Sequence, residues 1–251
     1  MKFWNNIAEK ARDVLLFFRK ILFPPRCVFC ERTLEPNLKT RVCGNCSNDI
    51  EFCSDKVCCA KCGKPILGYS EKQLCYFCIN EKKKYFKRIV SVFLYEGSTK
   101  KSIVKYKATG LSGHADVFTD CLAARIFEEY GDTKFDFLCG VPPHDTNKGF
   151  DHVGILCKRL SGRLGIPYTE DIFVKVRKTK KQSSLGYKER RENMKESLIV
   201  KPGHDVTGKT ALLIDDICTT RSTIIECSRA LKAAKAKNIY AATLATVKHP
   251  D

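Results

Sequence analysis

Residues 212–223, with the sequence LLIDDICTTRST, decide the fold. The apolar run that begins at Thr210 predicts a buried β-strand, and the next segment predicts a helix from about Ser222 to Lys235. A strand without alternating polar residues is buried on both faces, which is typical of a parallel sheet covered by helices. The segment therefore predicts one strand and one helix of an α/β domain.

The chain around this segment alternates in the same way. Further strands are predicted over 89–95, 135–141, 171–176 and 239–247, and further helices over 115–130 and 153–164. Strands that alternate with helices pair in parallel, because each helix returns the chain to the same edge of the sheet. The predicted fold class is therefore α/β, with a parallel sheet.

The loop after the predicted strand carries side chains suited to a sugar phosphate. Asp215 and Asp216 lie at the carboxyl end of the strand, where parallel sheets bind their ligands. Paired carboxylates suit ribose hydroxyls, directly or through Mg²⁺. Helix N-termini favour anions, and further donors come from four hydroxyl residues: Thr219, Thr220, Ser222 and Thr223. The alternative interpretation is an ordinary connection in which Asp and Thr cap the helix.

Ten of the 15 cysteines lie in the first 80 of 251 residues. Eight of them form Cys-x-x-Cys pairs that recur every 16 residues: Cys27/Cys30, Cys43/Cys46, Cys59/Cys62 and Cys75/Cys78. Two pairs supply the four thiolates of a structural zinc site, so two Zn²⁺ sites are predicted, with an iron–sulfur cluster as the less favoured alternative. Sequential pairing is preferred because it closes short loops, and interleaved pairing stays open. Cys58 is a substitute ligand in one version, and Cys53 is predicted to be a buried hydrophobe.

Composition divides the chain into three parts. Residues 1–23 predict an amphipathic helix, residues 24–80 a metal-held module, and residues 81–251 the α/β domain. The helix is expected to pack on its own protein, and the alternative is contact with a membrane surface or a docking partner. Its longest apolar run falls short of the roughly 20 residues of a membrane span. Without a secretory pattern either, a cytoplasmic protein is expected.

The chain is strongly basic, with 45 Lys and Arg against 28 Asp and Glu and a formal net charge of +17. This surplus favours an anionic partner, such as nucleic acid, an acidic membrane or a phosphorylated small molecule. Basic stretches lie over 82–107 and 175–191, and aromatic residues accompany the first: Tyr85, Phe86, Phe93, Tyr95 and Tyr106. They are candidates for stacking on the bases of single-stranded DNA. The alternative is that they belong to the cores of strands and helices.

The segment LLIDDICTTRST resembles the 5-phosphoribosyl-1-pyrophosphate (PRPP) signature of type I phosphoribosyltransferases, a hydrophobic strand followed by DD-x-x-TTG-x-T. With the cysteine pairs in front, the chain resembles the ComF family of competence proteins. Similar motifs follow in family order at 141–144 (VPPH), 148–151 (KGFD) and 182–193. Three residues depart from the family pattern: Arg221 replaces Gly, Lys148 replaces Arg, and Asp151 replaces Asn.

The resemblance implies a type I phosphoribosyltransferase-like domain preceded by a double zinc ribbon, and binding of PRPP with Mg²⁺. It assigns the binding to Asp215, Asp216, Thr219, Thr220, Arg221, Ser222, Thr223, Pro142 and Lys148, with Asp215 and Asp216 as catalytic residues. Such a protein assists uptake of single-stranded DNA in natural transformation, near the inner face of the cell membrane. The alternative is an active transferase that moves phosphoribose from PRPP to a nitrogen base. Arg221 leaves two interpretations of the loop open. Either its guanidinium pairs with the phosphate, or its replacement of glycine alters the loop too much for catalysis.

Overall fold

A computed structural model describes residues 22–35, 38, 40–66, 73–81, 84–143, 150–177 and 187–248. These residues form two compact units, one up to Ile50 and one from Glu51 onwards. The first unit contains α2 (Gly44–Asp49) and one of the cysteine clusters. Nearly all of the helix predicted over 1–23 lies outside the described residues, and the domain limits at 23 and 80 stay predictions.

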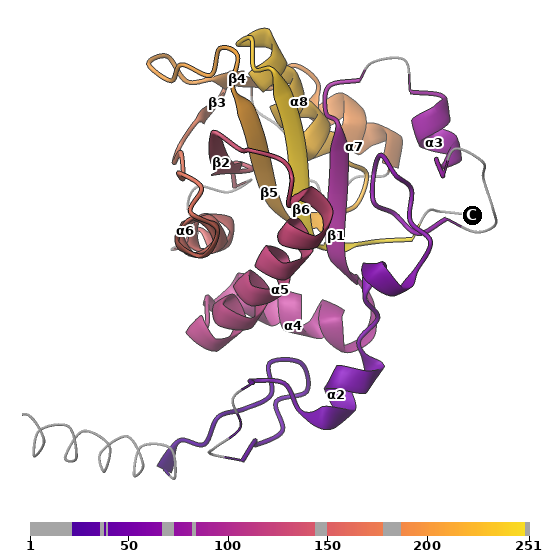
Figure 1. Cartoon of the computed structure of the whole chain (residues 1–251), viewed down its shortest axis with the longest axis vertical. Coiled ribbons are helices and arrows are strands. Elements are labelled where there is room, and N and C mark those ends of the chain that lie inside the picture. Colours follow the sequence, from indigo (N-terminus) through magenta and orange to yellow (C-terminus); the bar gives the residue numbers. More distant parts are fainter. Residues whose placement is uncertain are drawn as a thin grey trace, which may run out of the picture. The chain divides into compact units, whose positions relative to one another are not determined.

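A parallel sheet lies at the centre of the second unit (Figure 1). Each neighbouring pair of its strands is parallel, in the order β1 (Arg88–Leu94), β6 (Asn238–Thr246), β5 (Thr210–Cys218) and β2 (Phe137–Gly140). The central strand β5 pairs on both sides, with Ile214 opposite Ala242 of β6 and Gly140 of β2. The apolar run Ala211, Leu212, Leu213 and Ile214 is fully buried, as a strand covered on both faces requires, and Ile217 further along is partly exposed. The predicted α/β fold with a parallel sheet is confirmed.

Helices cover this sheet. On one face, α5 (Ser112–Tyr130) and α6 (His152–Leu164) contact the strands. On the other face, α8 (Ser222–Ala233) packs with Ala211 and Leu213 of β5. Asp151 caps α6, since its carboxylate accepts the backbone N–H groups of Val153 and Gly154 at 3.0 and 2.9 Å. Helix α4 (Gly97–Thr109) contacts α5 and is absent from the elements that the sequence predicts.

The strand predicted over 171–176 forms outside the parallel sheet. It is β3 (Phe173–Lys175), which pairs antiparallel with β4 (Leu198–Val200). Glu226 and Arg229 of α8 fasten this ribbon: the Leu198 N–H donates to Glu226 Oε1 at 3.0 Å, and Arg229 donates to the Leu198 carbonyl. Helix α7 (Tyr187–Met194) precedes β4 and contacts α8.

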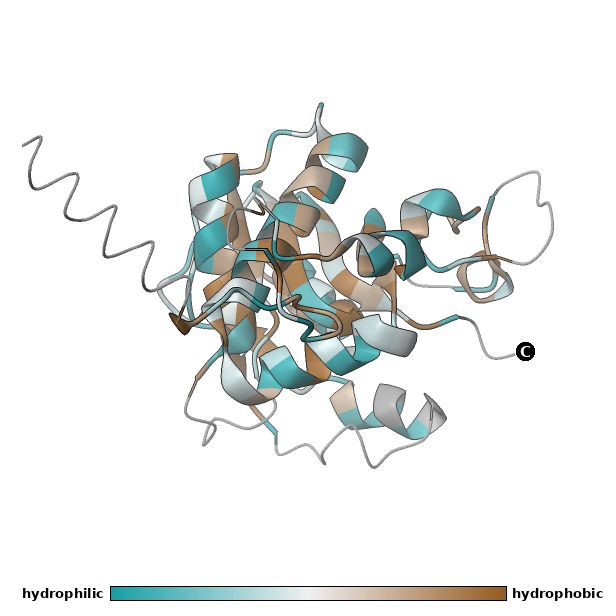
Figure 2. Cartoon of the chain, turned by 90° about the horizontal axis from the view of Figure 1, so that it is seen from below, coloured by the Kyte–Doolittle hydropathy of each residue, from teal (hydrophilic) through white to brown (hydrophobic). Residues whose placement is uncertain are grey.

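Hydrophobic residues concentrate in the strands and on the inner faces of the helices (Figure 2). Three of the aromatic residues considered for base stacking belong to this interior, namely Phe86, Phe93 and Tyr106. Tyr85 and Tyr95 are only half-buried. Among the described helices, none is long and apolar enough to span a bilayer.

Smaller elements hold the cysteine-rich part of the second unit. The 3₁₀ turn η1 (Cys53–Asp55) contacts β1, and α3 (Tyr76–Ile79) begins directly after Cys75. Gly63 has a φ of 68°, and a Cβ at this glycine would meet the Ile89 carbonyl at 2.5 Å. This glycine therefore allows the cysteine turn to lie against the edge strand.

Candidate functional site

The carboxyl end of the sheet brings most of the predicted site residues together. Asp215 and Asp216 lie near the end of β5, and both are buried. The N–H of Val141 donates to the Ile214 carbonyl at 2.9 Å, which puts Pro142 at the same edge. The hydroxyl loop and the N-terminus of α8 follow β5 directly. Lys148, also predicted for this site, lies outside the described residues.

One oxygen of Asp216 accepts hydrogen bonds from two helices. Lys107 Nζ of α4 lies 2.6 Å from Asp216 Oδ2, and His152 Nε2 at the start of α6 lies 2.6 Å from the same atom. Burial by itself would raise the pKa of Asp216, but the hydrogen bond from His152 and the charge of Lys107 lower that pKa to about 2. Asp216 is therefore an ionised acceptor that is held in place.

Asp215 has the opposite tendency. Its Oδ1 accepts the backbone N–H of Asp216 at 2.8 Å. Burial, and then the negative charge of Asp216, raise the pKa of Asp215 well above its ordinary value. A carboxylate accepts hydrogen bonds, whereas a protonated carboxyl also donates one. The pair can thus offer both kinds of partner to the hydroxyls of a sugar.

The loop after β5 turns through a left-handed residue. Arg221, directly before α8, has φ 66° and ψ 2°. A residue with a Cβ pays roughly 1–2 kcal/mol for this conformation, and glycine does not. Thr220 Oγ1 and Ser222 Oγ lie 2.7 Å apart on either side of it. The loop thus has the backbone turn for which the resembled signature uses glycine, and leads backbone amides into the N-terminus of α8.

The Arg221 side chain links this loop to a cysteine cluster. Its Nη1 donates to Cys78 Sγ at 3.1 Å and lies 3.7 Å from Glu81 Oε2. Glu81 also accepts a hydrogen bond from Lys61 Nζ at 2.8 Å. The guanidinium is buried. Arg221 therefore connects the loop between β5 and α8 directly to the sulfur atom of Cys78.

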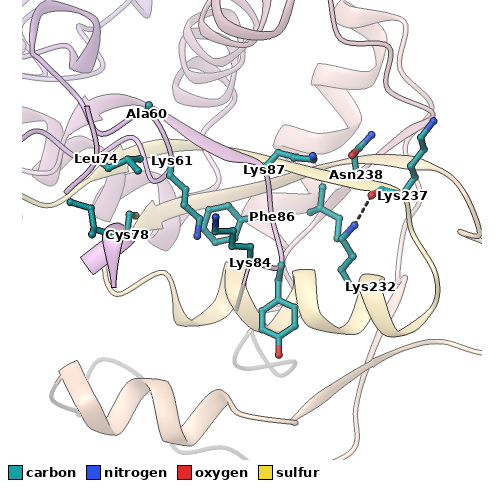
Figure 3. Close-up of a pocket in the computed structure, with 13 residues that line it drawn as sticks. Ala60, Lys61, Leu74, Cys78, Lys84, Phe86, Lys87, Lys232, Lys237 and Asn238 are labelled. Atoms are coloured by element: carbon teal, nitrogen blue, oxygen red, sulfur yellow. Dashed lines mark hydrogen bonds between the residues drawn. The ribbon is translucent and has the colours of Figure 1, made fainter. Parts of the chain in front are cut away.

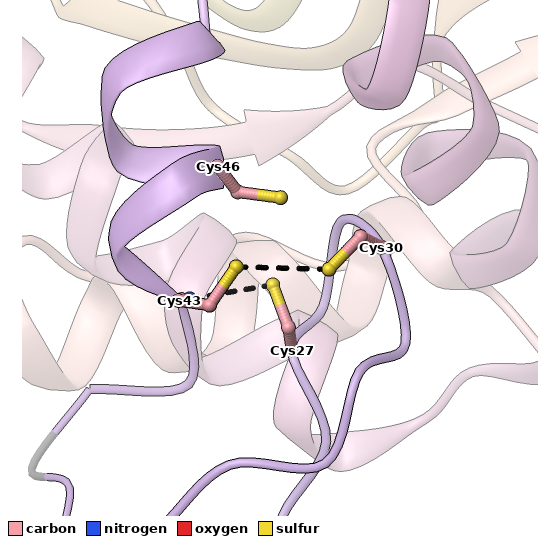
Figure 4. Close-up of side chains that lie close together, drawn as sticks. All are labelled: Cys27, Cys30, Cys43 and Cys46. Carbon is pink, nitrogen blue, oxygen red and sulfur yellow. Dashed lines mark hydrogen bonds between the residues drawn. The ribbon is translucent and has the colours of Figure 1, made fainter.

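Eight cysteines of the described chain gather into two groups of four. One group is Cys27, Cys30, Cys43 and Cys46 in the first unit (Figure 4), and the other is Cys59, Cys62, Cys75 and Cys78 in the second. Within each group all four sulfur atoms lie within 4.8 Å of one another. This is the sequential grouping of the pairs. Cys58 instead donates to the Cys53 carbonyl at 3.3 Å, and Cys53 is buried, as expected.

Both groups fit a structural zinc ion. Four thiolates at about 2.3 Å from a tetrahedral Zn²⁺ lie about 3.8 Å apart, and Cys30–Cys43 and Cys62–Cys75 have sulfur separations of 3.6 and 3.7 Å. Backbone amides support the sulfur atoms, since the Cys75 N–H donates to Cys59 Sγ at 3.3 Å.

Two residues of the site are not found by sequence reasoning. The sequence places Lys107 only in a basic stretch, and nothing in it marks His152. Both reach Asp216 from helices that are far from it in the chain, α4 and α6. The position of His152 directly after the KGFD motif is the one local signal that could have drawn attention to it.

Two family models match the chain. Residues 18–79 match the double zinc ribbon domain, and residues 119–250 match the phosphoribosyl transferase domain. The first match covers both cysteine groups, and the second covers the acid pair, the hydroxyl loop and α8. The resemblance seen in the sequence is therefore confirmed for both parts.

Similar proteins carry names related to DNA. The chain is 26% identical over 196 residues to the DNA utilization protein YhgH of Escherichia coli. The aligned region covers 76% of this chain and 83% of that protein. The chain is 31% identical over 86 residues to Competence protein F of Haemophilus influenzae. That aligned region covers 34% of this chain and 38% of that protein.

Similar solved structures are phosphoribosyltransferases. A purine phosphoribosyltransferase from Pyrococcus horikoshii has a TM-score of 0.34 at 23% identity, covering 53% of this chain and 72% of that chain. A hypoxanthine phosphoribosyltransferase from Staphylococcus aureus has a TM-score of 0.35 at 16% identity, covering 55% and 74%.

Proposed function

Because the chain belongs to the phosphoribosyl transferase domain family and carries a double zinc ribbon before that domain, we propose that it binds PRPP at the carboxyl end of β5. The observation that carries the proposal is the buried pair Asp215–Asp216 directly before the N-terminus of α8. A charged acceptor for ribose hydroxyls and a set of amides for a phosphate stand next to each other there.

Each part of PRPP has a partner in this site. Asp216 accepts hydrogen bonds from the ribose hydroxyls, and Asp215, when protonated, also donates one to them. The 5-phosphate lies on the amides at the start of α8 and on the hydroxyls of Thr219, Thr220, Ser222 and Thr223. The diphosphate lies towards Pro142 and Lys148, and its Mg²⁺ neutralises part of its charge. Lys107 and His152 already hold Asp216, so the ribose completes an existing network.

The cellular role that fits best is the handling of single-stranded DNA during natural transformation. Relatives named for DNA utilization and competence support this role, and the net charge of +17 suits a polyanionic partner. The protein then acts in the cytoplasm or at the inner face of the membrane, and the sequence over 1–23, which predicts an amphipathic helix, is the segment proposed to contact lipid or the competence machinery.

A second candidate function is transfer of phosphoribose to a nitrogen base. Asp215 and Asp216 favour it, because neighbouring acids whose pKa values are pushed in opposite directions are typical of catalytic sites. A base nitrogen would form a bond to the anomeric carbon of PRPP while the bond to the diphosphate oxygen breaks. Release of pyrophosphate distinguishes this function from binding alone.

Calorimetry with PRPP and Mg²⁺ tests the assignment of the site. We expect the wild type to bind, and Asp216→Ala to lose at least tenfold in affinity, since a hydrogen bond to a charged group contributes about 1.5–3 kcal/mol. The matched control is Asp120→Ala, which removes an exposed carboxylate from an ion pair with Arg163. Equal affinity of the wild type and Asp216→Ala would refute the site.

A pyrophosphate assay with added nucleobases separates the two candidate functions. Release of pyrophosphate would favour the transferase, and binding of PRPP without release would favour the DNA-handling role.

A further inference from the structure

A basic cavity of about 710 Å³ lies apart from the acid pair (Figure 3). Its walls come from the second cysteine cluster, the segment before β1, the end of α8 and the start of β6. The lining thus includes the amino ends of β1 and β6, whereas Asp216 lies near the carboxyl end of β5. We call this cavity the basic pocket.

Five of the 13 residues that line the basic pocket are lysines: Lys61, Lys84, Lys87, Lys232 and Lys237. Within the described part of the chain, its lining includes no Asp or Glu. Lys61 is paired with Glu81, which does not line the pocket, so the positive charge of the pocket comes from the other four lysines. The ammonium group of Lys232 donates to the carbonyls of Ala236 and Lys237, which are neutral acceptors. Burial, and then the charge of Lys87, lower the pKa of Lys232. Crowded positive charges of this kind favour the entry of an anion.

Apart from Asn238, the rest of the lining is apolar or aromatic. Leu74, Ile79 and Ile239 contribute aliphatic surface, and Phe86 lies under the Lys61 ammonium, 5.4 Å from it. Tyr85 also lines the pocket and is half-buried, so part of this residue is accessible. Lysines beside an aromatic and aliphatic wall suit a nucleotide, because phosphates bind ammonium groups and a base stacks on an aromatic ring. A volume of 710 Å³ is within the range of ligand sites.

We propose that the basic pocket binds a nucleotide of a single-stranded nucleic acid, with its phosphates on Lys84, Lys87 and Lys237 and its base against Tyr85. The inference rests on the proposed role in handling single-stranded DNA and adds the place where the strand lies. Because the basic pocket and the acid pair are at opposite ends of their strands, the protein can hold a DNA strand and PRPP at the same time.

Binding of a fluorescent dT₁₂ strand to the full chain, followed by anisotropy over a series of salt concentrations, tests the proposal. The test variant is Lys84→Gln/Lys87→Gln/Lys237→Gln, which changes three exposed lysines of the pocket. The control variant, Lys101→Gln/Lys134→Gln/Lys158→Gln, removes the same charge from exposed lysines that do not line it. Circular dichroism and thermal melting establish that both variants are folded.

We expect the pocket variant to bind dT₁₂ at least tenfold more weakly than the wild type at about 100 mM salt. Each phosphate contact on a single strand contributes about 0.7 to the slope of log affinity against log salt, so three lost contacts lower that slope by about 2. The control variant keeps the wild-type slope and loses less than threefold in affinity. Tyr85→Ala weakens binding of dT₁₂ but not of an abasic strand of equal length.

Four results would overturn the proposal. If the wild type binds dT₁₂ and the pocket variant binds equally well, the strand lies elsewhere and the DNA-handling role survives. If the control variant loses as much as the pocket variant, the binding is a general effect of charge. If the wild type does not bind dT₁₂, both the pocket assignment and the DNA-handling role fail. Free dTTP competing as strongly per molecule as dT₁₂ would assign the pocket to a free nucleotide instead.

Discussion

A single oxygen atom, Asp216 Oδ2, is the meeting point of Lys107 and His152. The pKa of Asp216 in the folded protein, about 2, lies below its ordinary value of 3.8. The ionised form therefore contributes stability at pH values above 3.8, and the contribution is lost as the pH falls through about 2. The ionised form of Asp215 has the opposite effect on stability. Burial raises the pKa of Asp215, so its charged form destabilises the folded protein.

This difference predicts unequal effects of two similar substitutions. Asp216→Asn removes a charge that Lys107 needs, and we expect it to lower the free energy of unfolding by about 2–3 kcal/mol at pH 7, which is the stability that a pKa of about 2 in place of 3.8 provides. Asp215→Asn replaces a carboxyl group that favours its neutral form, and we expect a change below about 1 kcal/mol. Urea unfolding followed by circular dichroism measures both. A larger loss for Asp215→Asn than for Asp216→Asn would show that the two roles are reversed.

Among the secondary-structure elements, Arg221 connects the N-terminus of α8 to the second cysteine cluster. Its backbone is in the left-handed region, and its guanidinium donates to Cys78 Sγ at 3.1 Å. A hydrogen bond to a zinc thiolate holds the ligand in place and neutralises part of its charge. The arginine that stands where the resembled signature has glycine thus has a structural partner outside the loop between β5 and α8.

Substitution of this residue predicts a change at one zinc site only. Arg221→Gly relieves the backbone strain but removes the donor to Cys78, and we expect one of two zinc equivalents to dissociate about tenfold faster. A colorimetric chelator follows the release. The cluster of Cys27, Cys30, Cys43 and Cys46 is an internal control, and Arg229→Gln is a control on the same helix. Two equivalents released at wild-type rates would contradict the role given to Arg221.

The elements also show where sequence reasoning succeeds and where it fails. Strands β1, β5 and β6 are predicted because each is a continuous apolar run that the sheet buries. Helix α4 is missed because its sequence, GSTKKSIVKYKAT, reads as a basic patch with few apolar residues. Lys107 comes from that helix, so the error in one element also hides a partner of Asp216.

At the scale of the whole molecule, composition reveals the charge but not its placement. The basic pocket combines Lys61, Lys84 and Lys87 with Lys232 and Lys237, which lie about 150 residues further along the chain. Only the parallel pairing of β1 with β6 brings those segments together. The cysteine pairs are different, because their regular spacing predicts two sites of four cysteines before any tertiary contact is known. The spacing alone leaves sequential and interleaved grouping open, and the structure has the sequential grouping, which short loops favour. Local spacing is readable from sequence, whereas convergence across a sheet depends on the fold.

The central claim is that the end of β5 and the start of α8 together hold PRPP. A crystal structure of the protein grown with PRPP and Mg²⁺ tests it most directly. We predict density for the ribose within hydrogen-bond distance of Asp216, and for the 5-phosphate against the backbone amides of residues 219–223. Density for PRPP at another place, or none at this edge of the sheet at saturating PRPP, would contradict the claim.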